Sequence, residues 1–194
     1  MLIVWNDPAR VEAELSSGRL TCPRCDGELG PWGYARQRIL RTRANNEDLR
    51  PRRARCRDCQ KTSVLLPDVC LVRRVDEVAV IGAALLAQSK GDGHRKIATT
   101  LGRPHETVRG WLRRFSLRAA MLQAHFRRWA LACDPRLDEI TPQDSMTKDA
   151  LEAIGLATRA GSLLLGPRPV WCWASAMTGG LLLCNTSSPF PTPR

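Results

Sequence analysis

The chain has 194 residues, of which 30 are Lys or Arg, 19 are Asp or Glu and eight are Cys, giving a formal net charge of +11. With 43% hydrophobic and 25% charged residues it has enough apolar side chains for a folded core, which excludes the disordered and fibrous classes. Such a basic surface favours a polyanionic partner, either nucleic acid or an anionic lipid face.

The apolar segments of the chain are short. The N-terminal run ends at Asn6 and is too short for the apolar region of a secretion signal. The longest uncharged apolar run, residues 170–184, contains two glycines and falls short of the roughly 20 residues that span a bilayer. We therefore expect a soluble, cytoplasmic protein with no membrane partner, whose cysteines bind metal more readily than they form disulfides.

The positive charge is confined to the first two thirds of the chain. Residues 1–74 carry a net +6, residues 75–134 a net +5, and residues 135–194 no net charge. The residue pattern changes at the same places, from Cys- and Arg-rich extended sequence to helical periodicity and then to a stretch rich in Gly, Pro and Leu. The last ten residues, 185–194, are rich in Pro, Ser and Thr and predict a flexible tail.

Two C-x-x-C pairs predict a metal site formed by Cys22, Cys25, Cys56 and Cys59. Two such turns complete a tetrahedral four-cysteine site, for which we expect one structural zinc ion, because no coordination position is left open for water. A redox C-x-x-C is the alternative, but the βαβ pattern of a thioredoxin-like site is absent. The cysteines without partner spacing predict buried small side chains, at Cys70, Cys133, Cys172 and Cys184.

The sequence around these pairs predicts a zinc ribbon of short antiparallel strands. Residues 34–43 are extended in character, residues 45–48 supply a turn, residues 49–56 return, and residues 62–66 form a further strand that Pro67 ends. In a strand, alternate arginines point to one face, and few acids lie nearby, so we expect phosphate contacts rather than internal ion pairs. These arginines are Arg53, Arg55 and Arg57, with Arg36 and Arg38 on the preceding strand and Arg41 and Arg43 on its other face.

Helical periodicity begins after Asp76, which we expect to cap the first helix. An apolar stripe at Val78, Ile81, Leu85 and Leu86 predicts a helix that ends at the glycines of residues 91–93. A second, shorter helix is expected over residues 94–101. A third has Pro104 in its first turn and continues to about residue 124.

The spacing of four residues predicts that the second and third helices form a helix-turn-helix. Ala98 allows the helices to approach closely, Gly102 permits a left-handed turn, and Val108 and Trp111 fill the angle between the helices. An ordinary helical hairpin is the alternative interpretation. In a helix-turn-helix, the third helix would enter the major groove of DNA.

The residues expected to contact DNA lie near this turn. Arg109 and Arg113, one helical turn apart, would reach guanine edges or phosphates. Glu106 would either accept a hydrogen bond from a cytosine amino group or mark a face outside the groove. The remaining candidates, mainly for phosphate contact, are Arg95, Lys96, Arg103, His105 and Arg114 on the helices and Arg53 and Arg55 on the ribbon.

A zinc ribbon followed by a helix-turn-helix resembles the N-terminal DNA-binding half of bacterial insertion-sequence transposases. The chain is still more similar to small actinobacterial helix-turn-helix proteins of unassigned function. The runs that carry this resemblance are residues 22–25, 31–34, 49–56, 80–86, 103–104 and 107–114, with looser similarity at 149–155 and 178–180. It covers about residues 1–130 and implies DNA binding of transposase ancestry. Glu106 stands where many of these proteins have a small hydroxyl residue.

The last third of the chain does not predict a transposase active site. Such enzymes hold two metal ions with carboxylates spread over a long α/β domain. Here the acids crowd into 15 positions, at Asp138, Glu139, Asp144, Asp149 and Glu152. Helices are expected over residues 148–161 and 171–177, where they would cap the core or, alternatively, form a homodimer contact.

We therefore expect an α+β protein without enzymatic activity that binds DNA. Its expected parts are an N-terminal helical segment capped at Asp7-Pro8 (1–20), a zinc ribbon (21–70), a trihelical helix-turn-helix domain (75–130), a helical C-terminal extension (135–184) and a flexible tail (185–194). It would act as a transcriptional regulator or a transposase-derived protein. The alternatives are an inactive transposase fragment or accessory protein, and an RNA-binding zinc-ribbon protein.

Overall fold

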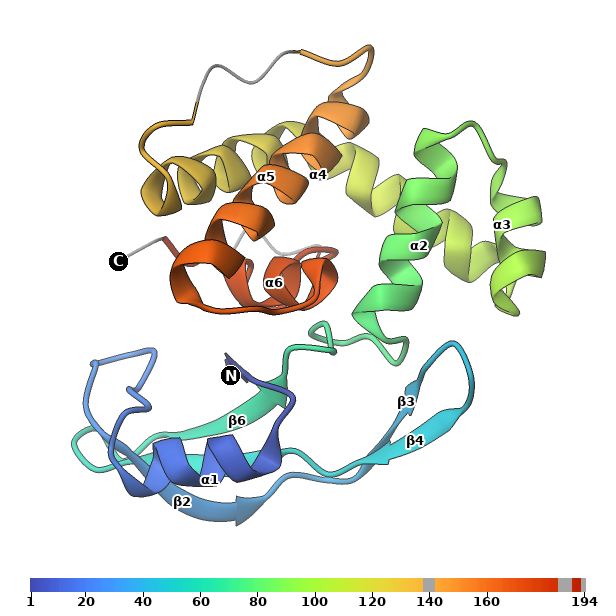
Figure 1. The fold of residues 1–194 in the computed structure, drawn as a ribbon. Helices are drawn as coiled ribbons and strands as arrows, with labels where there is room; N and C mark the ends of the chain where they lie inside the picture. The colour runs from blue at the N-terminus through green and yellow to red at the C-terminus, as the bar shows by residue number, and fades with distance from the viewer. Residues whose placement is uncertain (138–141, 185–189, 193–194) are drawn as a thin grey trace.

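The computed structural model describes residues 1–137, 142–184 and 190–192 (Figure 1). Figure 1 shows two lobes, one built of strands with one helix and the other of helices alone. The strand lobe contains β1 (Leu2–Val4), α1 (Pro8–Ser16), β2 (Leu29–Tyr34), β3 (Arg38–Arg41), β4 (Asn46–Leu49), β5 (Arg52–Cys56) and β6 (Thr62–Pro67). The helical lobe contains α2 (Val78–Ser89), α3 (His94–Leu101), α4 (His105–Cys133), α5 (Met146–Leu165) and α6 (Val170–Met177). The α+β class is confirmed.

The main sheet of the strand lobe has the order β1-β6-β5-β2. Strands β6, β5 and β2 are antiparallel neighbours as expected, but β1 pairs with β6 in parallel, with Leu2 opposite Leu65. The expected N-terminal helical segment is therefore present as α1, but the strand β1 that precedes it was not foreseen. The short apolar run at the N-terminus adds an edge strand to the sheet, a pairing between segments some 60 residues apart that local sequence does not reveal.

Helix α1 confirms the predicted cap at Asp7 and Pro8. Asp7 Oδ1 accepts a hydrogen bond from the backbone N–H of Arg10 over 3.1 Å, which satisfies a donor at the helix start. Pro8 occupies the first helical position, where no N–H is needed. The helix buries Val11 and Leu15 against the sheet in a small core.

Strands β3 and β4 form a separate two-stranded sheet, and their turn differs from the predicted one. The turn was expected at residues 45–48, but β4 already begins at Asn46. The chain reverses between Thr42 and Asn45 instead, because the Thr42 backbone N–H donates to the Asn45 carbonyl over 2.9 Å and the Thr42 hydroxyl donates to Asn45 Oδ1 over 2.8 Å. Side-chain hydrogen bonds of this kind favour turns over strands.

In the helical lobe, α3 has the predicted bounds, whereas α2 and α4 differ at one end each. Helix α2 follows Glu77, which makes no side-chain cap, so the expected cap by Asp76 was wrong. Helix α4 extends beyond residue 124 to Cys133, because its buried positions continue through Phe126 and Ala130 against the rest of the core. Pro104 was expected in the first turn of this helix, but it occupies the position before the first helical residue, His105.

The C-terminal helices complete the core of the helical lobe. Helix α5 lies along α4 in Figure 1, and residues of α5 and α6 belong to the same buried cluster as those of α2, α3 and α4. Gly82 allows α2 to contact α6 closely, since a Cβ atom there would lie only 2.0 Å from the Trp171 ring. The expectation that these helices cap the core is confirmed. Among the described helices, none combines the length and apolarity needed to cross a membrane.

The predicted flexible tail lies mostly outside the described residues. Residues 190–192 are described, and Phe190 is buried with its ring centroid 4.6 Å from that of His125. At this position the expectation of a free tail was wrong, because an aromatic side chain finds an apolar site on α4.

The two lobes are joined by polar and aromatic contacts. The Arg168 guanidinium, which precedes α6, lies 3.5 Å from the ring centroid of Trp5 and 4.5 Å from that of Trp173. Its Nε atom is 3.1 Å from a carboxylate oxygen of Asp68, which follows β6. The Ser175 hydroxyl on α6 donates to the carbonyl of Cys70, in the segment between the lobes, over 2.6 Å. These contacts hold the helical lobe against the sheet.

Candidate metal centre and basic surface

Each C-x-x-C pair lies on a tight turn, and the two turns have the same backbone geometry. The N–H of the first cysteine donates to the carbonyl five residues later, over 2.8 Å at Cys22 and 2.9 Å at Cys56. The residue after the second cysteine has a left-handed backbone in both turns, with φ of 58° at Asp26 and 59° at Gln60. Such φ values are uncommon outside glycine. Because both turns have the same uncommon conformation, they present their pairs of cysteine sulfurs in the same way.

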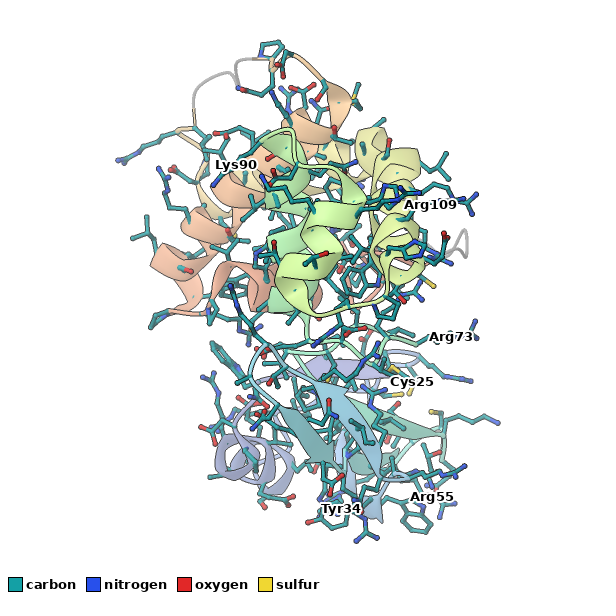
Figure 2. All side chains as sticks on the ribbon, turned by 90° about the vertical axis from the view of Figure 1, so that its right-hand side faces the viewer. Cys25, Tyr34, Arg55, Arg73, Lys90 and Arg109 are labelled. Atoms are coloured by element: carbon teal, nitrogen blue, oxygen red, sulfur yellow. The ribbon has the colours of Figure 1, made fainter. Side chains whose placement is uncertain are left out.

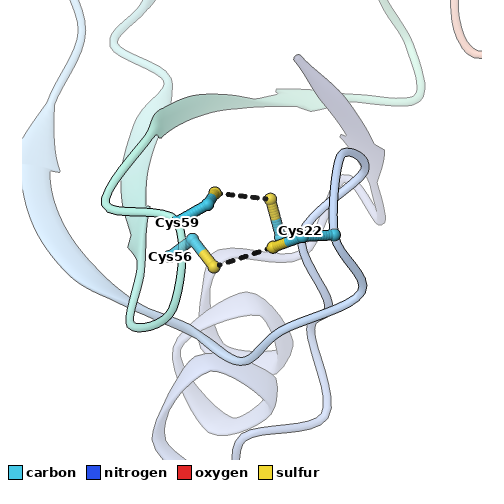
Figure 3. A group of neighbouring side chains, drawn as sticks. Cys22, Cys56 and Cys59 are labelled. Atoms are coloured by element: carbon cyan, nitrogen blue, oxygen red, sulfur yellow. Dashed lines mark hydrogen bonds between the residues drawn. The ribbon is translucent and has the colours of Figure 1, made fainter.

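The four cysteine sulfurs converge between these turns (Figure 3). The Sγ atoms of Cys22 and Cys59 are 3.7 Å apart, those of Cys25 and Cys56 are 3.5 Å apart, and all four lie within 4.8 Å of one another. A tetrahedral zinc site with Zn–S bonds of about 2.3 Å separates its sulfurs by about 3.8 Å. The cluster could therefore hold a metal ion, and its donors and spacing are consistent with one zinc.

The surroundings of Cys22 and Cys25 shift the pKa values of their thiols in opposite directions. A hydrogen bond from the Arg24 backbone lowers the pKa of Cys22 to about 7. The Gly27 backbone acts in the same direction on Cys25, but contact with the Cys59 and Cys56 thiols outweighs it and raises the pKa of Cys25 to about 12. Neighbouring thiolates repel one another, so a bound metal ion stabilises the fully deprotonated cluster.

The other four cysteines take no part in this cluster. Cys70, Cys172 and Cys184 are buried, as predicted, and Cys133 is only half-buried. Burial raises the pKa of Cys172 to about 12, so its thiol stays protonated and unreactive at neutral pH.

The start of α4 and the adjoining α3 carry most of the residues predicted to contact DNA. Figure 2 shows Arg109 extending from this part of the helical lobe. The exposed members of the predicted set are Arg95, Lys96, His105, Glu106, Arg109 and Arg113. Lys96 pairs with Asp92 over 2.6 Å. This face is predominantly cationic and is open to a ligand.

Glu106, the acidic member of the set, lies between two cationic or ionisable side chains. Its Oε1 atom is 3.3 Å from Arg109 Nη1 and 3.3 Å from His105 Nδ1. All three side chains are exposed, so these pairings are weak and water competes for them. Glu106 therefore partly balances the charge of Arg109 without locking it in place.

Two arginines of the predicted set are used inside the protein. The Arg103 side chain is only 12% exposed; its Nε atom donates to Asp76 over 2.6 Å and its Nη2 atom donates to the Thr42 carbonyl over 2.6 Å. The expectation that Arg103 contacts phosphate was therefore wrong, because a buried carboxylate in the linker engages it. Arg114 is half-buried, and its Nη1 atom donates to the Gly110 carbonyl on the same helix over 3.0 Å.

The arginines of the strand lobe fall into two groups. Arg57 pairs with Glu28 over 3.2 Å and Arg41 pairs with Asp76 over 2.7 Å, so the expectation that acids are too few to pair them was wrong at these positions. Arg53 and Arg55 have no carboxylate partner among the described residues. Of the remaining candidates, Arg36 and Arg43 are exposed and Arg38 is half-buried.

The sequence reasoning missed two exposed aromatic side chains beside these arginines. Trp32 is 49% exposed and Tyr34 is 53% exposed. The Arg55 guanidinium lies 4.6 Å from the Trp32 ring centroid. The sequence does contain a pattern that could have indicated Trp32 and Tyr34: two large aromatic residues flank Gly33 in a segment rich in cysteine and arginine. Figure 2 also places Arg109, Arg73, Cys25 and Arg55 in succession along one edge that spans both lobes.

The acids of the last third do not gather into a second cluster among the described residues. Asp144 pairs with Lys148 over 2.8 Å, and Asp149 accepts from the Gln143 backbone over 2.7 Å at the start of α5. Glu152 is exposed. The other two acids, Asp138 and Glu139, lie outside the described residues. The four-cysteine cluster is the single group of three or more metal-ligating side chains found in the described ranges.

No protein-family profile, no curated protein and no solved structure matches this chain.

Proposed function

We propose that the protein is a non-catalytic DNA-binding protein in which α3 and α4 form a helix-turn-helix and the strand lobe is a ribbon held by one structural zinc ion. The observation that carries the proposal is the joint between the two helices. Gly102 has a left-handed backbone with φ of 60°, while Ala98, Val108 and Trp111 are buried in the angle between α3 and α4. This joint leaves the start of α4 exposed, as major-groove recognition requires.

The exposed face supplies both kinds of contact that duplex recognition uses. Arg109 and Arg113 lie one turn apart on α4, a spacing suited to adjacent guanine edges or phosphates. Arg95 on α3 is exposed and would contact the backbone. When Arg109 contacts DNA, its pairing with Glu106 would break. Glu106 could then accept a hydrogen bond from a cytosine amino group.

Zinc would serve the strand lobe as a structural ion. The core of this lobe is small, formed by residues such as Leu15, Leu29 and Leu65, and two ligands, Cys22 and Cys56, are themselves part of it. A closed four-cysteine site fixes the two turns relative to each other and leaves no coordination position for a reacting water. The metal would thereby orient the arginines of β5 for backbone contacts.

The proposal is tested by measuring fluorescence anisotropy of labelled DNA duplexes, selected from a random pool, across a salt series. We expect one sequence to be preferred and Arg109→Ala to weaken its binding about tenfold. Arg159→Ala is the matched control, because it removes the same charge from an exposed position on a different helix, α5. Equal affinity for all duplexes and for RNA, with equal effects of both substitutions, would refute it.

A further inference from the structure

The strand lobe carries a feature that duplex recognition by α4 does not use. Trp32 and Tyr34, two residues apart, are both about half exposed, and Trp and Tyr are enriched where proteins bind their partners. They lie on β2, one of the two edge strands of the main sheet.

The backbone of β2 is shaped to present these rings. The pairing of β2 with β5 is regular up to Pro31 and shifts before Tyr34, and Gly33 within this irregularity has φ of 77°. Arg52 holds the irregular segment in place, because its Nη1 atom donates to the Gly33 carbonyl over 2.7 Å. Bulges of this kind re-aim side chains at functional edges of sheets.

Cations accompany both rings. The guanidinium of Arg55 lies 4.6 Å from the Trp32 ring centroid, and those of Arg52 and Arg50 lie 4.8 Å and 5.2 Å from that of Tyr34. Arg52 is also paired with Glu12 over 2.6 Å, whereas Arg50 and Arg55 have no carboxylate partner among the described residues. In a single nucleic-acid strand, the bases can stack on aromatic rings and the phosphates can contact arginines that have no carboxylate partner.

A cavity of about 190 Å³ opens beside Tyr34. Its walls include Trp5, Pro8, Pro51 and Leu65, so it offers an apolar pocket next to an aromatic ring. A flat apolar group that stacks on Tyr34 therefore finds a further apolar surface at its edge.

We infer that this end of the strand lobe binds unpaired nucleotides, whose bases stack on Trp32 and Tyr34 while their phosphates contact Arg50, Arg53 and Arg55. Figure 2 places Tyr34 and Arg55 at the end of the molecule remote from Arg109. Resting on the proposed function, this inference implies that the protein prefers a duplex that continues into a single strand over a blunt duplex.

The experiment compares a blunt duplex, the same duplex with a single-stranded extension of roughly 12 nucleotides, and the extension alone as DNA or RNA. We expect the extension to tighten binding about tenfold and Trp32→Ala to remove that gain without changing the affinity for the blunt duplex. Trp32→Phe, which keeps a ring, should retain most of it. Ile39→Ala is the matched control, since Ile39 is equally exposed on β3.

The outcomes separate the inference from the proposed function. An extension that adds no affinity, or a gain that survives Trp32→Ala, would overturn the inference while leaving duplex binding intact. A protein that binds the free single strand but not the duplex would overturn the proposed function and retain the stacking site. Polyglutamate competing as well as oligothymidylate would overturn the inference, because charge alone would then explain the binding. The RNA arm identifies which polymer supplies the bases.

Discussion

The carboxylate of Asp76 lies 2.6 Å from Arg103 Nε and is only 3% exposed. Its second oxygen accepts from Arg41 over 2.7 Å. One residue in the linker before α2 therefore binds both the β3–β4 hairpin and the turn between α3 and α4. These two contacts add to those of Arg168 in holding the helical lobe against the strand lobe.

Replacing Asp76 should destabilise the protein strongly. Asp76→Ala leaves the Arg103 guanidinium buried without its counter-ion, and breaking such a pair costs about 3–5 kcal/mol. Urea unfolding monitored by circular dichroism would measure the loss. Asp92→Ala is the control, because the Asp92–Lys96 pair is exposed and should contribute less than about 1 kcal/mol. Equal losses in the two variants would contradict this role for Asp76.

Removing one thiol of the cysteine cluster should abolish the metal binding that we propose and destabilise the strand lobe. We expect Cys22→Ser to abolish stoichiometric zinc in the purified protein, measured by mass spectrometry of metals, and to lower the melting temperature. The loss should be several kcal/mol, because zinc contributes about 10–16 kcal/mol to the folding of small zinc-dependent peptides. Cys133→Ser, which alters a half-buried thiol outside the cluster, should keep the metal. Retention of zinc by Cys22→Ser would be inconsistent with the site.

Two glycine substitutions should shift stability in opposite directions. Neither Gly102 nor Gly155 has an atom within 4 Å of an added Cβ, so only the backbone matters. Gly102→Ala forces alanine into a left-handed conformation and should cost about 1–2 kcal/mol. Gly155→Ala lies inside α5 and should stabilise by up to about 1 kcal/mol. Chemical denaturation measures both, and a shift of the same sign would rule out the strained turn.

Stability should fall in mildly acidic solution because of His125. Burial lowers the pKa of this histidine, whose Nε2 atom is 2.9 Å from the Met177 carbonyl. Below pH 6.5 the unfolded histidine binds a proton that the folded one does not bind until its lowered pKa is reached. The free energy of unfolding should therefore decrease as pH falls through that window, by at most about 1.4 kcal/mol per pH unit.

The measurement is urea unfolding at several pH values between 7.5 and 5. His125→Gln retains a donor for the Met177 carbonyl and has no proton to gain, so its stability should depend less on pH than that of the unsubstituted protein. Identical slopes for the two proteins would show that His125 does not cause the effect.

Local patterns predicted the parts of the fold that depend on neighbouring residues. The bounds of α3 follow from a glycine on each side and three apolar positions, and the cap of α1 follows from Asp7 and Pro8. The cysteine cluster was predictable because the spacing within each C-x-x-C pair fixes the turn that brings its two sulfurs together. These features need no information about distant segments.

Features formed by distant segments were not predictable from the same patterns. The pairing of β1 with β6 depends on residues some 60 positions apart. Arg103 looked like a surface cation because its partner, Asp76, is 27 residues away and itself resembled a helix cap. The exposure of Trp32 was equally hidden, since large aromatic side chains usually enter a core.

The guanidinium of Arg168 between Trp5 and Trp173 has a consequence for the order in which the protein forms during synthesis. Trp5 leaves the ribosome well before Arg168 and Trp173 do. The strand lobe has all of its strands and all four clustered cysteines within residues 1–70, so its sheet can form while the helices are still being synthesised. The contacts of Asp76 with Arg41 and Arg103 can form next, whereas the Arg168 contacts that complete the joint between the lobes follow only once α6 has been made.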